Sequence, residues 1–345
     1  MSTSASESTA DPALASALLT QARATVDPIL RDALSMLPSP LDVMAGNHFG
    51  WCDIDGAPMS SVSGKALRPA FMFAAARSVG RTPDVVAHAA AAVELLHNFS
   101  LVHDDIMDGD ALRHGRATVW KTWGVTNATL VGDGLQALAT RVLTAHAPAP
   151  VLAEAVRRLT ITSVELCGGQ YLDCAFEQRA SVAIGDYLAM ATGKTGALIG
   201  CACALGGLLA GADPSSVHAL DAYGRMVGVA FQLVDDVIGI WGDPNNTGKP
   251  AGTDLVRRKR TFPVVRLLGS GLPQADQLAT IYQGREPLSD AEVAAAIGLL
   301  DAAGGSAPTL RCAEDQITAA FDALPAHLRT DDLLALAQLA AHRDR

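Results

Sequence analysis

Two short acidic segments mark where this chain could do chemistry: DDIMDGD, which begins at Asp104, and DDVIG, which begins at Asp235. Each follows a long apolar stretch, where adjacent carboxylates are unfavourable unless a partner compensates their charge. Carboxylate oxygens are the preferred ligands of hard divalent cations, and such cations can bridge carboxylates to phosphate oxygens. The two segments therefore predict a site for divalent ions and a phosphorylated substrate.

In the first segment the spacing favours one face of a helix. Asp104 and Asp108 are four residues apart, so they point the same way, and a cation between them relieves their repulsion. Asp105 lies about 100° around the helix, so we expect it to support the site from behind or to face solvent. In the second segment the position four after Asp235 is Gly239, so the matching carboxylate is missing. Because magnesium keeps several water ligands, one carboxylate and substrate oxygens can still hold it.

The distribution of lysines supports a phosphate site. Only 5 of the 26 basic residues are lysines, and four of these lie in motifs that could bind a substrate. The four are Lys65 in SGKALRP, Lys194 in TGKTG, Lys249 in TGKP and Lys259 in RRKR. An ammonium group neutralises phosphate charge, whereas a guanidinium group makes forked contacts, for which Arg68, Arg113 and Arg116 are candidates.

Long helices are needed to position these residues. Ala and Leu dominate, aromatic residues make up 5% of the chain, and helical periodicity runs almost throughout without a convincing alternating strand. Turn residues interrupt it at 46–64, 80–83, 212–215, 242–252, 269–273 and 302–308. We therefore predict a disordered tail over residues 1–12 and a single all-α domain of ten or more helices over residues 13–345.

The two acidic segments also resemble each other, since FSLVHDD at 99–105 is echoed by FQLVDD at 231–236. This echo predicts two facing helices that bring carboxylates into one cavity, as in the metal sites of helical bundles. Acids, divalent ions, bases and an apolar cavity together suggest ionisation of a carbon–diphosphate bond. The ions would stabilise the departing anion, and a dry pocket would protect the resulting cation from water.

Composition limits the location and the partners. The net charge of −10 argues against nucleic acid as the main partner. Six cysteines without a CxxC pair or a Cys/His cluster predict reduced thiols and a cytoplasmic location. The uncharged stretch 195–212 approaches the length of a membrane span, but it contains several glycines and follows Lys194, so we expect a buried core helix.

The region from Gly64 to Pro263 resembles the trans-isoprenyl diphosphate synthase (polyprenyl synthetase) family, and in particular its geranylgeranyl diphosphate synthases. The resemblance is carried by the ordered motifs GKALRP, LLHNFSLVHDDIMDGDALRHGRAT, GGQYLD, GKTG, FQLVDDVIG and GKPAGTDLVRRKRT. It implies the isoprenoid-synthase fold around a central apolar cavity, and usually a homodimer. The implied reaction joins isopentenyl diphosphate head-to-tail to dimethylallyl, geranyl or farnesyl diphosphate.

The resemblance also implies roles for residues that bind the two diphosphates. Around the allylic diphosphate, three Mg²⁺ ions would be held by Asp104, Asp108 and Asp235, helped by Arg113, Lys194 and Lys259. Isopentenyl diphosphate would be bound by Gly64, Lys65, Arg68 and His97. For His97 the alternative is a hydrogen-bonded core histidine, but its place two turns before Asp104 on the same face favours the substrate role.

Other implied roles concern the developing cation and access to the site. Thr195 and Gln232 would lie near the allylic cation, Gln170 and Asp173 would support that wall, and Lys249 lies in a loop able to close over the site. Pyrophosphate itself would remove the final proton.

Two positions depart from the family pattern. A second arginine commonly follows the position of Arg113, but this chain has His114, and a neutral imidazole offers one donor where guanidinium offers five. We therefore expect a weaker grip on isopentenyl diphosphate. The other departure is Gly239, where the family commonly has Asp. Since Asp235 is the expected ligand there, we expect activity to survive.

Product length depends on the residues beneath the allylic site. Ser100, one turn before Asp104, is too small to form a floor, whereas Phe99 is large enough and Leu96 could form a deeper stop. In the family an aromatic beside a small residue resembles enzymes of the C20 class. We expect geranylgeranyl diphosphate, with farnesyl diphosphate second and the C25 geranylfarnesyl diphosphate third.

Two other functions stay open. A terpene cyclase, which is a lyase on the same fold, is kept in view by His114 and Gly239, although an intact GKALRP argues against it because a cyclase binds no second diphosphate. A non-catalytic regulatory subunit is the other alternative. Such chains usually lose the first aspartates, and this one keeps Asp104, Asp105 and Asp108.

Overall fold

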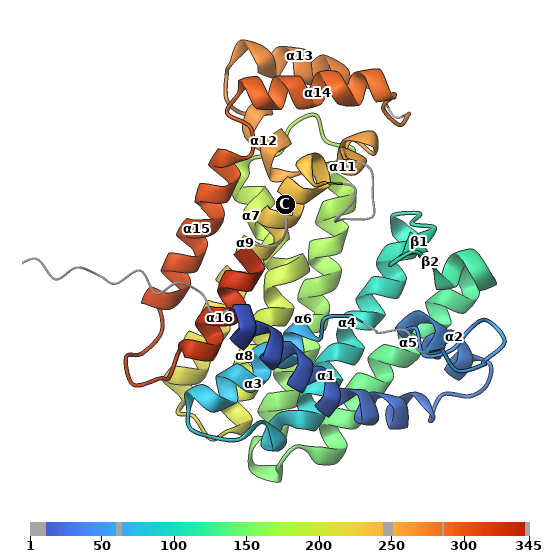
Figure 1. Ribbon diagram of the computed structural model, residues 1–345, viewed down its shortest axis with the longest axis vertical. Coiled ribbons are helices and arrows are strands. Elements are labelled where there is room, and N and C mark those ends of the chain that lie inside the picture. The colour runs from blue at the N-terminus through green and yellow to red at the C-terminus, as the bar shows by residue number, and fades with distance from the viewer. Residues whose placement is uncertain (1–11, 60–63, 244–250, 285, 342–345) are drawn as a thin grey trace, which may run out of the picture.

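The computed structural model describes residues 12–59, 64–243, 251–284 and 286–341, and nearly all of them are in helices or in short connections (Figure 1). The helices are α1 (Pro12–Leu34), α2 (Leu41–Phe49), α3 (Leu67–Ser78), η1 (Pro83–Val86), α4 (Ala87–Met107), α5 (Val119–His146), α6 (Ala149–Phe176), α7 (Ile184–Ala191), the π-helical segment η2 (Thr192–Gly196), α8 (Ala197–Leu209), α9 (Pro214–Trp241), α11 (Thr253–Val256), α12 (Phe262–Leu268), α13 (Pro273–Ile281), α14 (Asp290–Ala302), α15 (Ala307–Asp322) and α16 (Asp331–Ala341). Two-residue strands β1 (Leu112–Arg113) and β2 (Arg116–Ala117) form an antiparallel hairpin.

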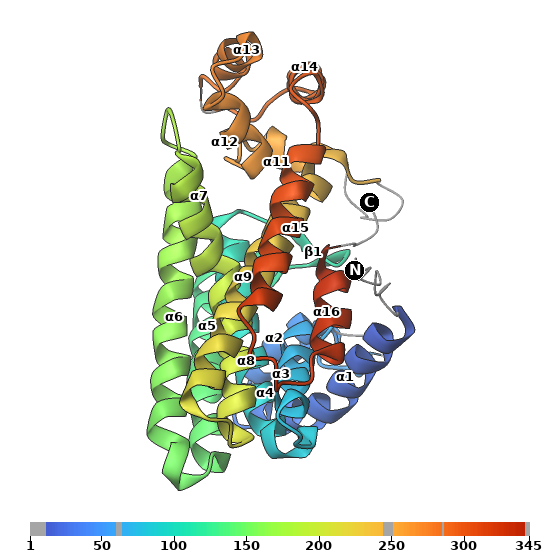
Figure 2. The same cartoon turned by 90° about the vertical axis from the view of Figure 1, so that its left-hand side faces the viewer.

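The main body is a bundle of long helices. α4 packs along α5, α8 packs along α9, and α3 and α15 lie on α8 and α9. Figure 2 shows α5 and α6 along one side of the body, with α1, α3 and α16 on the other. Small and branched apolar residues allow this close packing, and Phe71, Phe73, Leu95 and Leu135 are among its fully buried side chains.

A smaller group of helices, α11 to α14, sits above the body (Figure 1) and has its own apolar core. Leu255, Val264, Leu278 and Leu288 are buried in it. Ser289 and Glu292 form a capping box that begins α14. This group holds the RRKR segment, which lies between α11 and α12.

The connection between α7 and α8 is a π-helical segment, η2, which contains TGKTG. α6 approaches it so closely at Gly169 that a Cβ there would lie 2.2 Å from the backbone nitrogen of Lys194. Only glycine therefore lets α6 run against this segment. π-helical turns widen a helix and are frequent at functional sites.

The structure confirms the all-α prediction with more than ten helices. The expectation of no strand is wrong for the β1–β2 hairpin, where positive φ angles at His114 and Gly115 turn the chain between two short extended pairs. The turn predicted from residue 46 begins later, because α2 continues to Phe49 and ends on Gly50 in the left-handed conformation. The tail predicted for residues 1–12 lies outside the described residues except for Pro12, which begins α1.

Among the described residues, two helical stretches, Pro83–Met107 and Ile184–Leu209, are long and apolar enough to cross a membrane, and α14 and α15, bent by 64° at their break, meet the same criteria only as a pair. In the fold, 67% and 72% of the most apolar windows of the two long stretches are buried against other elements. The second stretch includes most of the segment that we expected to be a core helix.

Candidate active site

The first acidic segment lies at the C-terminal end of α4. Asp108 follows the last residue of the helix, and its amide donates to the carbonyl of Asp104 at 2.8 Å, so the two carboxylates keep the predicted one-turn spacing. Both side chains are half-buried. Burial raises the pKa of Asp104 to about 6, with the positive charge of Lys194 opposing the shift and the charge of Asp108 adding to it.

Asp105 points the other way and is buried. Its carboxylate accepts a forked pair of hydrogen bonds from Arg113 on β1, from Nε at 3.0 Å and from Nη2 at 2.7 Å. The possibility that Asp105 faces solvent is therefore wrong, because the turn of α4 into the hairpin encloses it. It supports the site from behind and fixes Arg113.

The second acidic pair, on α9, divides in the same way. Asp235 is exposed, whereas Asp236 is buried. Asp236 accepts hydrogen bonds from the Tyr187 hydroxyl at 2.5 Å, the Phe262 amide at 2.7 Å and Gln232 Nε2 at 3.0 Å. Burial raises the pKa of Asp236 to about 7, although these donors oppose the shift.

Two of the predicted lysines lie beside these carboxylates. Lys194 Nζ is 2.5 Å from Asp173 Oδ2, and Lys259 Nζ is 3.6 Å from Asp108 Oδ2. Burial is the largest influence and disfavours both ammonium groups, but the surrounding carboxylates together outweigh it and raise both lysine pKa values. Asp173 contributes most among them at Lys194, and Asp108 contributes most at Lys259. Both lysines are therefore fully charged at neutral pH.

Asp173 connects the two acidic segments electrostatically. Its charge raises the pKa of Asp104 on one side, and its charge and that of Asp235 both raise the pKa of Tyr187 on the other. Asp104 is therefore within electrostatic reach of the Lys194–Asp173 pair, while Asp173 and Asp235 both act on Tyr187. That the carboxylates of α4 and α9 line one cavity stays a prediction.

The residues expected near the allylic cation form a hydrogen-bonded chain. Thr195 Oγ1 donates to Gln232 Oε1 at 2.8 Å, and Gln232 Nε2 donates in turn to Asp236 Oδ1 at 3.0 Å. Gln170 Nε2 lies 3.5 Å from Asp108 Oδ1, while Gln170 Oε1 is buried without a hydrogen-bond partner among the described residues. This wall presents oxygen atoms, which stabilise a nearby positive charge.

The residues expected to bind isopentenyl diphosphate lie where α3 meets α4. Gly64 and Lys65 are exposed, and Arg23 of α1 donates to the Gly64 carbonyl. Burial, together with the charges of Arg68 and Arg113, lowers the pKa of His97 well below its usual value, so His97 is neutral and can donate only one hydrogen. His114 is exposed at the hairpin turn, and its charge would act on His97.

Of two further predicted phosphate contacts, one has protein partners in this structure and the other lies outside the described residues. Arg116 donates to the carbonyls of Asn47 at 2.6 Å and His48 at 3.1 Å, so its guanidinium group caps the end of α2. Lys249 falls in the segment 244–250, which the structure does not describe.

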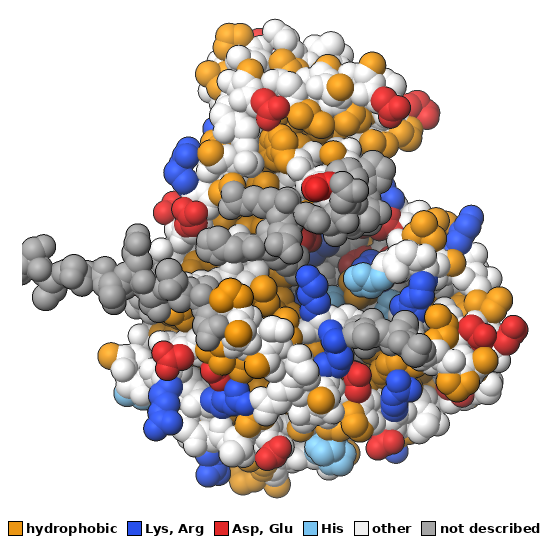
Figure 3. Space-filling model, viewed as in Figure 1, with side chains coloured by type: hydrophobic (Ala, Val, Ile, Leu, Met, Phe, Trp, Pro, Cys, Tyr) orange, Lys and Arg blue, Asp and Glu red, His pale blue; other side chains and the backbone are white. Residues whose placement is uncertain are grey.

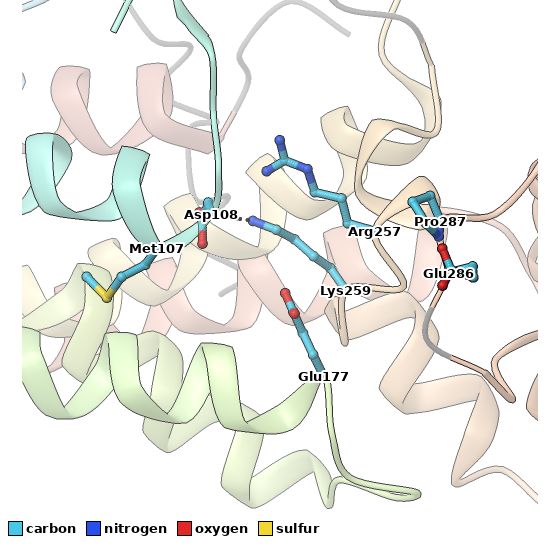
Figure 4. A pocket seen from close by; sticks show the side chains of 7 residues that line it. All are labelled: Met107, Asp108, Glu177, Arg257, Lys259, Glu286 and Pro287. Atoms are coloured by element: carbon cyan, nitrogen blue, oxygen red, sulfur yellow. Dashed lines mark ion pairs between the residues drawn. The ribbon is translucent and has the colours of Figure 1, made fainter. Parts of the chain in front are cut away.

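The first acidic segment opens onto a cavity of about 220 Å³ (Figure 4). Asp108, Lys259 and Glu177 point toward one another in it, and its lining is completed by Met107, Arg257, Glu286 and Pro287. Arg257 also forms an ion pair with Asp110, which joins the RRKR segment to the loop after α4. Figure 3 shows acidic, basic and histidine side chains gathered around a recess between the α11–α14 group and the body.

The donor atoms suit a hard divalent ion. Asp104, Asp108 and Asp235 offer only carboxylate oxygens, which Mg²⁺ prefers. Among the residues that the structure describes, no three His, Cys, Asp or Glu side chains are gathered closely enough to hold an ion alone. An ion here would therefore need further oxygens, and a diphosphate supplies them.

Sequence reasoning missed several residues of this region. Tyr187 anchors Asp236, and His48 on α2 shares a 3.0 Å hydrogen bond with Asn98 of α4. Asp254 on α11 lies directly against Gly239 of α9. Its place in GTDLVRRKR, three residues before the basic run that contains Lys259, was the available signal.

The residues expected to set product length line α4. Leu96 and Phe99 are buried, and Phe99 packs edge-to-face on His103 with ring centroids 4.8 Å apart. Ser100 is half-buried, and its hydroxyl donates to the His97 carbonyl.

Comparisons with known proteins agree with this geometry. The profile of the polyprenyl synthetase family matches residues 57–300. The chain is 48% identical to a geranylgeranyl diphosphate synthase of Mycobacterium tuberculosis over 331 residues, covering 96% of this chain and 95% of the relative. It is 44% identical to a (2E,6E)-farnesyl diphosphate synthase of Mycobacterium bovis, covering 81% of this chain and 79% of that one.

The fold also matches a solved structure. A polyprenyl synthetase from Streptomyces coelicolor A3(2) superposes with a TM-score of 0.87 at 42% identity, covering 94% of this chain and 98% of that one. The motifs, the helical fold and these similarities lead to one conclusion: the chain belongs to the polyprenyl synthetase family, whose members are prenyltransferases that lengthen isoprenoid diphosphates.

Proposed function

We propose that the protein joins an allylic diphosphate head-to-tail to isopentenyl diphosphate and releases geranylgeranyl diphosphate as its main product. The observation that carries this proposal is the ion pair of Asp108 with Lys259 in the lining of a cavity, one turn from Asp104, whose pKa responds to the charge of Lys194. Carboxylates for metal ions and charged lysines for phosphate oxygens are both needed to draw pyrophosphate away from carbon. The C20 product is supported by the 48% identical relative, which is a geranylgeranyl diphosphate synthase.

The site's own residues account for the remaining requirements. We propose that Asp104, Asp108 and Asp235 hold three Mg²⁺ ions. These ions would supply positive charge for the leaving diphosphate. The Lys194–Asp173 pair keeps the lysine charged and oriented. The oxygens of Thr195 and Gln232 face the developing cation, and neutral His97 with Arg68 binds the second substrate.

We also propose a cytoplasmic homodimer that does not span a membrane. The two apolar helical stretches support this, since most of each is already covered by other helices and so needs no lipid. A homodimer is supported by exposed apolar residues on the outer side of α6, among them Val164 and Tyr171.

The test is product analysis by mass spectrometry. The purified chain is incubated with Mg²⁺, isopentenyl diphosphate and, in turn, dimethylallyl, geranyl or farnesyl diphosphate. We expect a C20 diphosphate. A C15 or C25 end product would overturn the chain length, hydrocarbon released without isopentenyl diphosphate would make the protein a cyclase, and no turnover would make it non-catalytic.

A variant pair ties the activity to the site. Asp104→Asn should lower kcat by about 10²-fold or more, because each tenfold is about 1.4 kcal/mol and a metal contributes several. Asp133→Asn is the control, because Asp133 is an exposed aspartate on α5. Equal activity in the two variants would contradict the role of Asp104.

A further inference from the structure

Gly239 of α9, which stands where a second carboxylate would share the face of Asp235, lies directly against Asp254 of α11. A Cβ built on Gly239 would lie 2.0 Å from Oδ2 and 2.8 Å from Cγ of Asp254. The carboxylate of Asp254 therefore fills the space that a side chain at 239 would need. Gly239 lies one helical turn after Asp235, on the face that carries Asp235.

Asp254 is held there by the backbone around it. It lies in the single turn of α11, whose preceding residue, Gly252, has a φ of 76° and donates its amide to the Ile240 carbonyl at 3.1 Å. The Asp254 carbonyl accepts from the Lys259 amide at 3.0 Å. These contacts connect α11 to the end of α9 and to the catalytic lysine.

The charge of Asp254 reaches the site from this position. After Asp108, Asp254 is the next group whose charge favours the ammonium form of Lys259, and it also disfavours ionisation of Asp236. Asp254 thus lies beside the second acidic segment and acts on Lys259, the partner of Asp108 in the first, although it is contributed by a different element from either.

We infer that Asp254 is a further acidic residue of the metal–diphosphate site, and that Gly239 admits it by having no side chain. α11 thereby supplies the carboxylate that α9 lacks one turn after Asp235. The inference rests on the proposed function and names how the second acidic segment holds divalent ions. It also explains why residue 239 is a glycine, because any larger residue there would displace Asp254.

The test measures Mg²⁺ binding and not catalytic turnover. Thermal stability is measured while Mg²⁺ is titrated at a fixed concentration of inorganic pyrophosphate, and the half-saturating Mg²⁺ concentration is compared. We expect Asp254→Asn, which keeps the shape, to raise that concentration about 10- to 100-fold, the usual effect of losing a group that supports a metal site. Gly239→Ala should do the same by displacing Asp254.

Asp254→Ala, two double variants built on it and one control isolate the contact. Once Asp254→Ala has removed the carboxylate, the residual Cβ of residue 254 lies 3.5 Å from the Cβ position at 239, which is ordinary contact. Gly239→Ala should therefore add nothing in that background, whereas Gly239→Asp should recover part of the Mg²⁺ affinity from α9. Gly298→Ala is the control, because nothing lies within 4 Å of that helical glycine.

Additive effects of Gly239→Ala and Asp254→Ala, or an unchanged Mg²⁺ titration in Asp254→Asn, would overturn the inference. Stability without Mg²⁺ verifies that each variant is folded. Wild-type product formation is measured in parallel, because its absence overturns the proposed function, whereas an active enzyme with a Mg²⁺-insensitive Asp254→Asn overturns only the role of Asp254.

Discussion

In each adjacent pair of aspartates, Asp104–Asp105 and Asp235–Asp236, the second residue is buried and the first is more exposed. Asp105 and Asp236 turn inward and accept hydrogen bonds that fix the surrounding loops, whereas Asp104 is half-buried and Asp235 is exposed, and these two are the proposed ligands. Such a division explains how apolar helices tolerate four carboxylates, because each buried charge has donors of its own.

Phe99 is expected to limit the length of the product. It is buried on α4, five residues before Asp104, and we expect Phe99→Ala to lengthen the product because the removed ring leaves room for a longer chain. Since truncating a buried Phe costs about 3–5 kcal/mol of stability, Phe99→Leu is assayed as a milder change. Ser100→Ala is the control, and its products should keep the wild-type length. Unchanged chain length in a radiolabelled extension assay of Phe99→Ala would remove Phe99 as the floor.

At the scale of elements, the position of Lys194 depends on how closely α6 meets the π-helical segment. Gly169→Ala would place a Cβ 2.2 Å from the Lys194 nitrogen, and neither backbone can move cheaply. We expect a loss of kcat of tenfold or more together with reduced stability, because a shift of about 1 Å in a positioning group can cost 10²-fold in rate.

The adjacent glycine provides a matched control for this prediction. Gly168→Ala has nothing within 4 Å of its Cβ, and alanine is the better helix former, so activity and stability should be kept or slightly improved. Both variants are compared by kcat and by thermal unfolding. Equal behaviour would mean that the approach of α6 to the segment does not position Lys194.

The same elements show what the sequence could and could not predict. Helical periodicity and the spacing of Asp104 and Asp108 depend on neighbours along the chain, and both were predicted correctly. The π-helical turn at Thr192–Gly196, the buried Asp105–Arg113 pair and the contact of Asp254 with Gly239 depend on how distant segments meet. A sequence alone does not distinguish a glycine that leaves space for a neighbouring carboxylate from a glycine that only lowers helix stability.

At the scale of the whole molecule, buried carboxylates make stability depend on pH. Burial raises the pKa of Asp236 to about 7 from an ordinary value of 3.8, so the folded protein keeps this proton to a higher pH than the unfolded chain does. Its contribution is fully favourable below about pH 4 and is lost as pH rises toward 7. We expect Asp236→Asn, compared with wild type by urea unfolding in chelator, to lose less stability between pH 5 and 7.5. Parallel pH profiles would show that Asp236 ionises normally.

The outer face of α6 is the other whole-molecule feature. Val164 and Tyr171 are each 71% exposed and Ile161 is 43% exposed, and their spacing places them along one side of the helix. Val125 and Leu130 of the neighbouring α5 are also exposed. Exposed apolar residues along one side of a helix are typical of a protein–protein interface, and a second copy of the chain is the partner that the proposed homodimer requires.

If this face joins two copies, a charge at its centre should separate them. We expect Val164→Glu to shift the protein from dimer to monomer in light scattering at micromolar concentration, because an unpaired carboxylate buried in an apolar contact is strongly unfavourable. Leu272→Glu serves as the control, since Leu272 is a 42% exposed apolar residue between α12 and α13 and its loss should leave the dimer intact. A Val164→Glu protein that stays dimeric would place the interface elsewhere, and a monomeric wild type would contradict the homodimer. Because the dimer face of α6 carries no residue of the metal–diphosphate site, a monomeric variant that retains its kcat would show that each copy holds a complete active site.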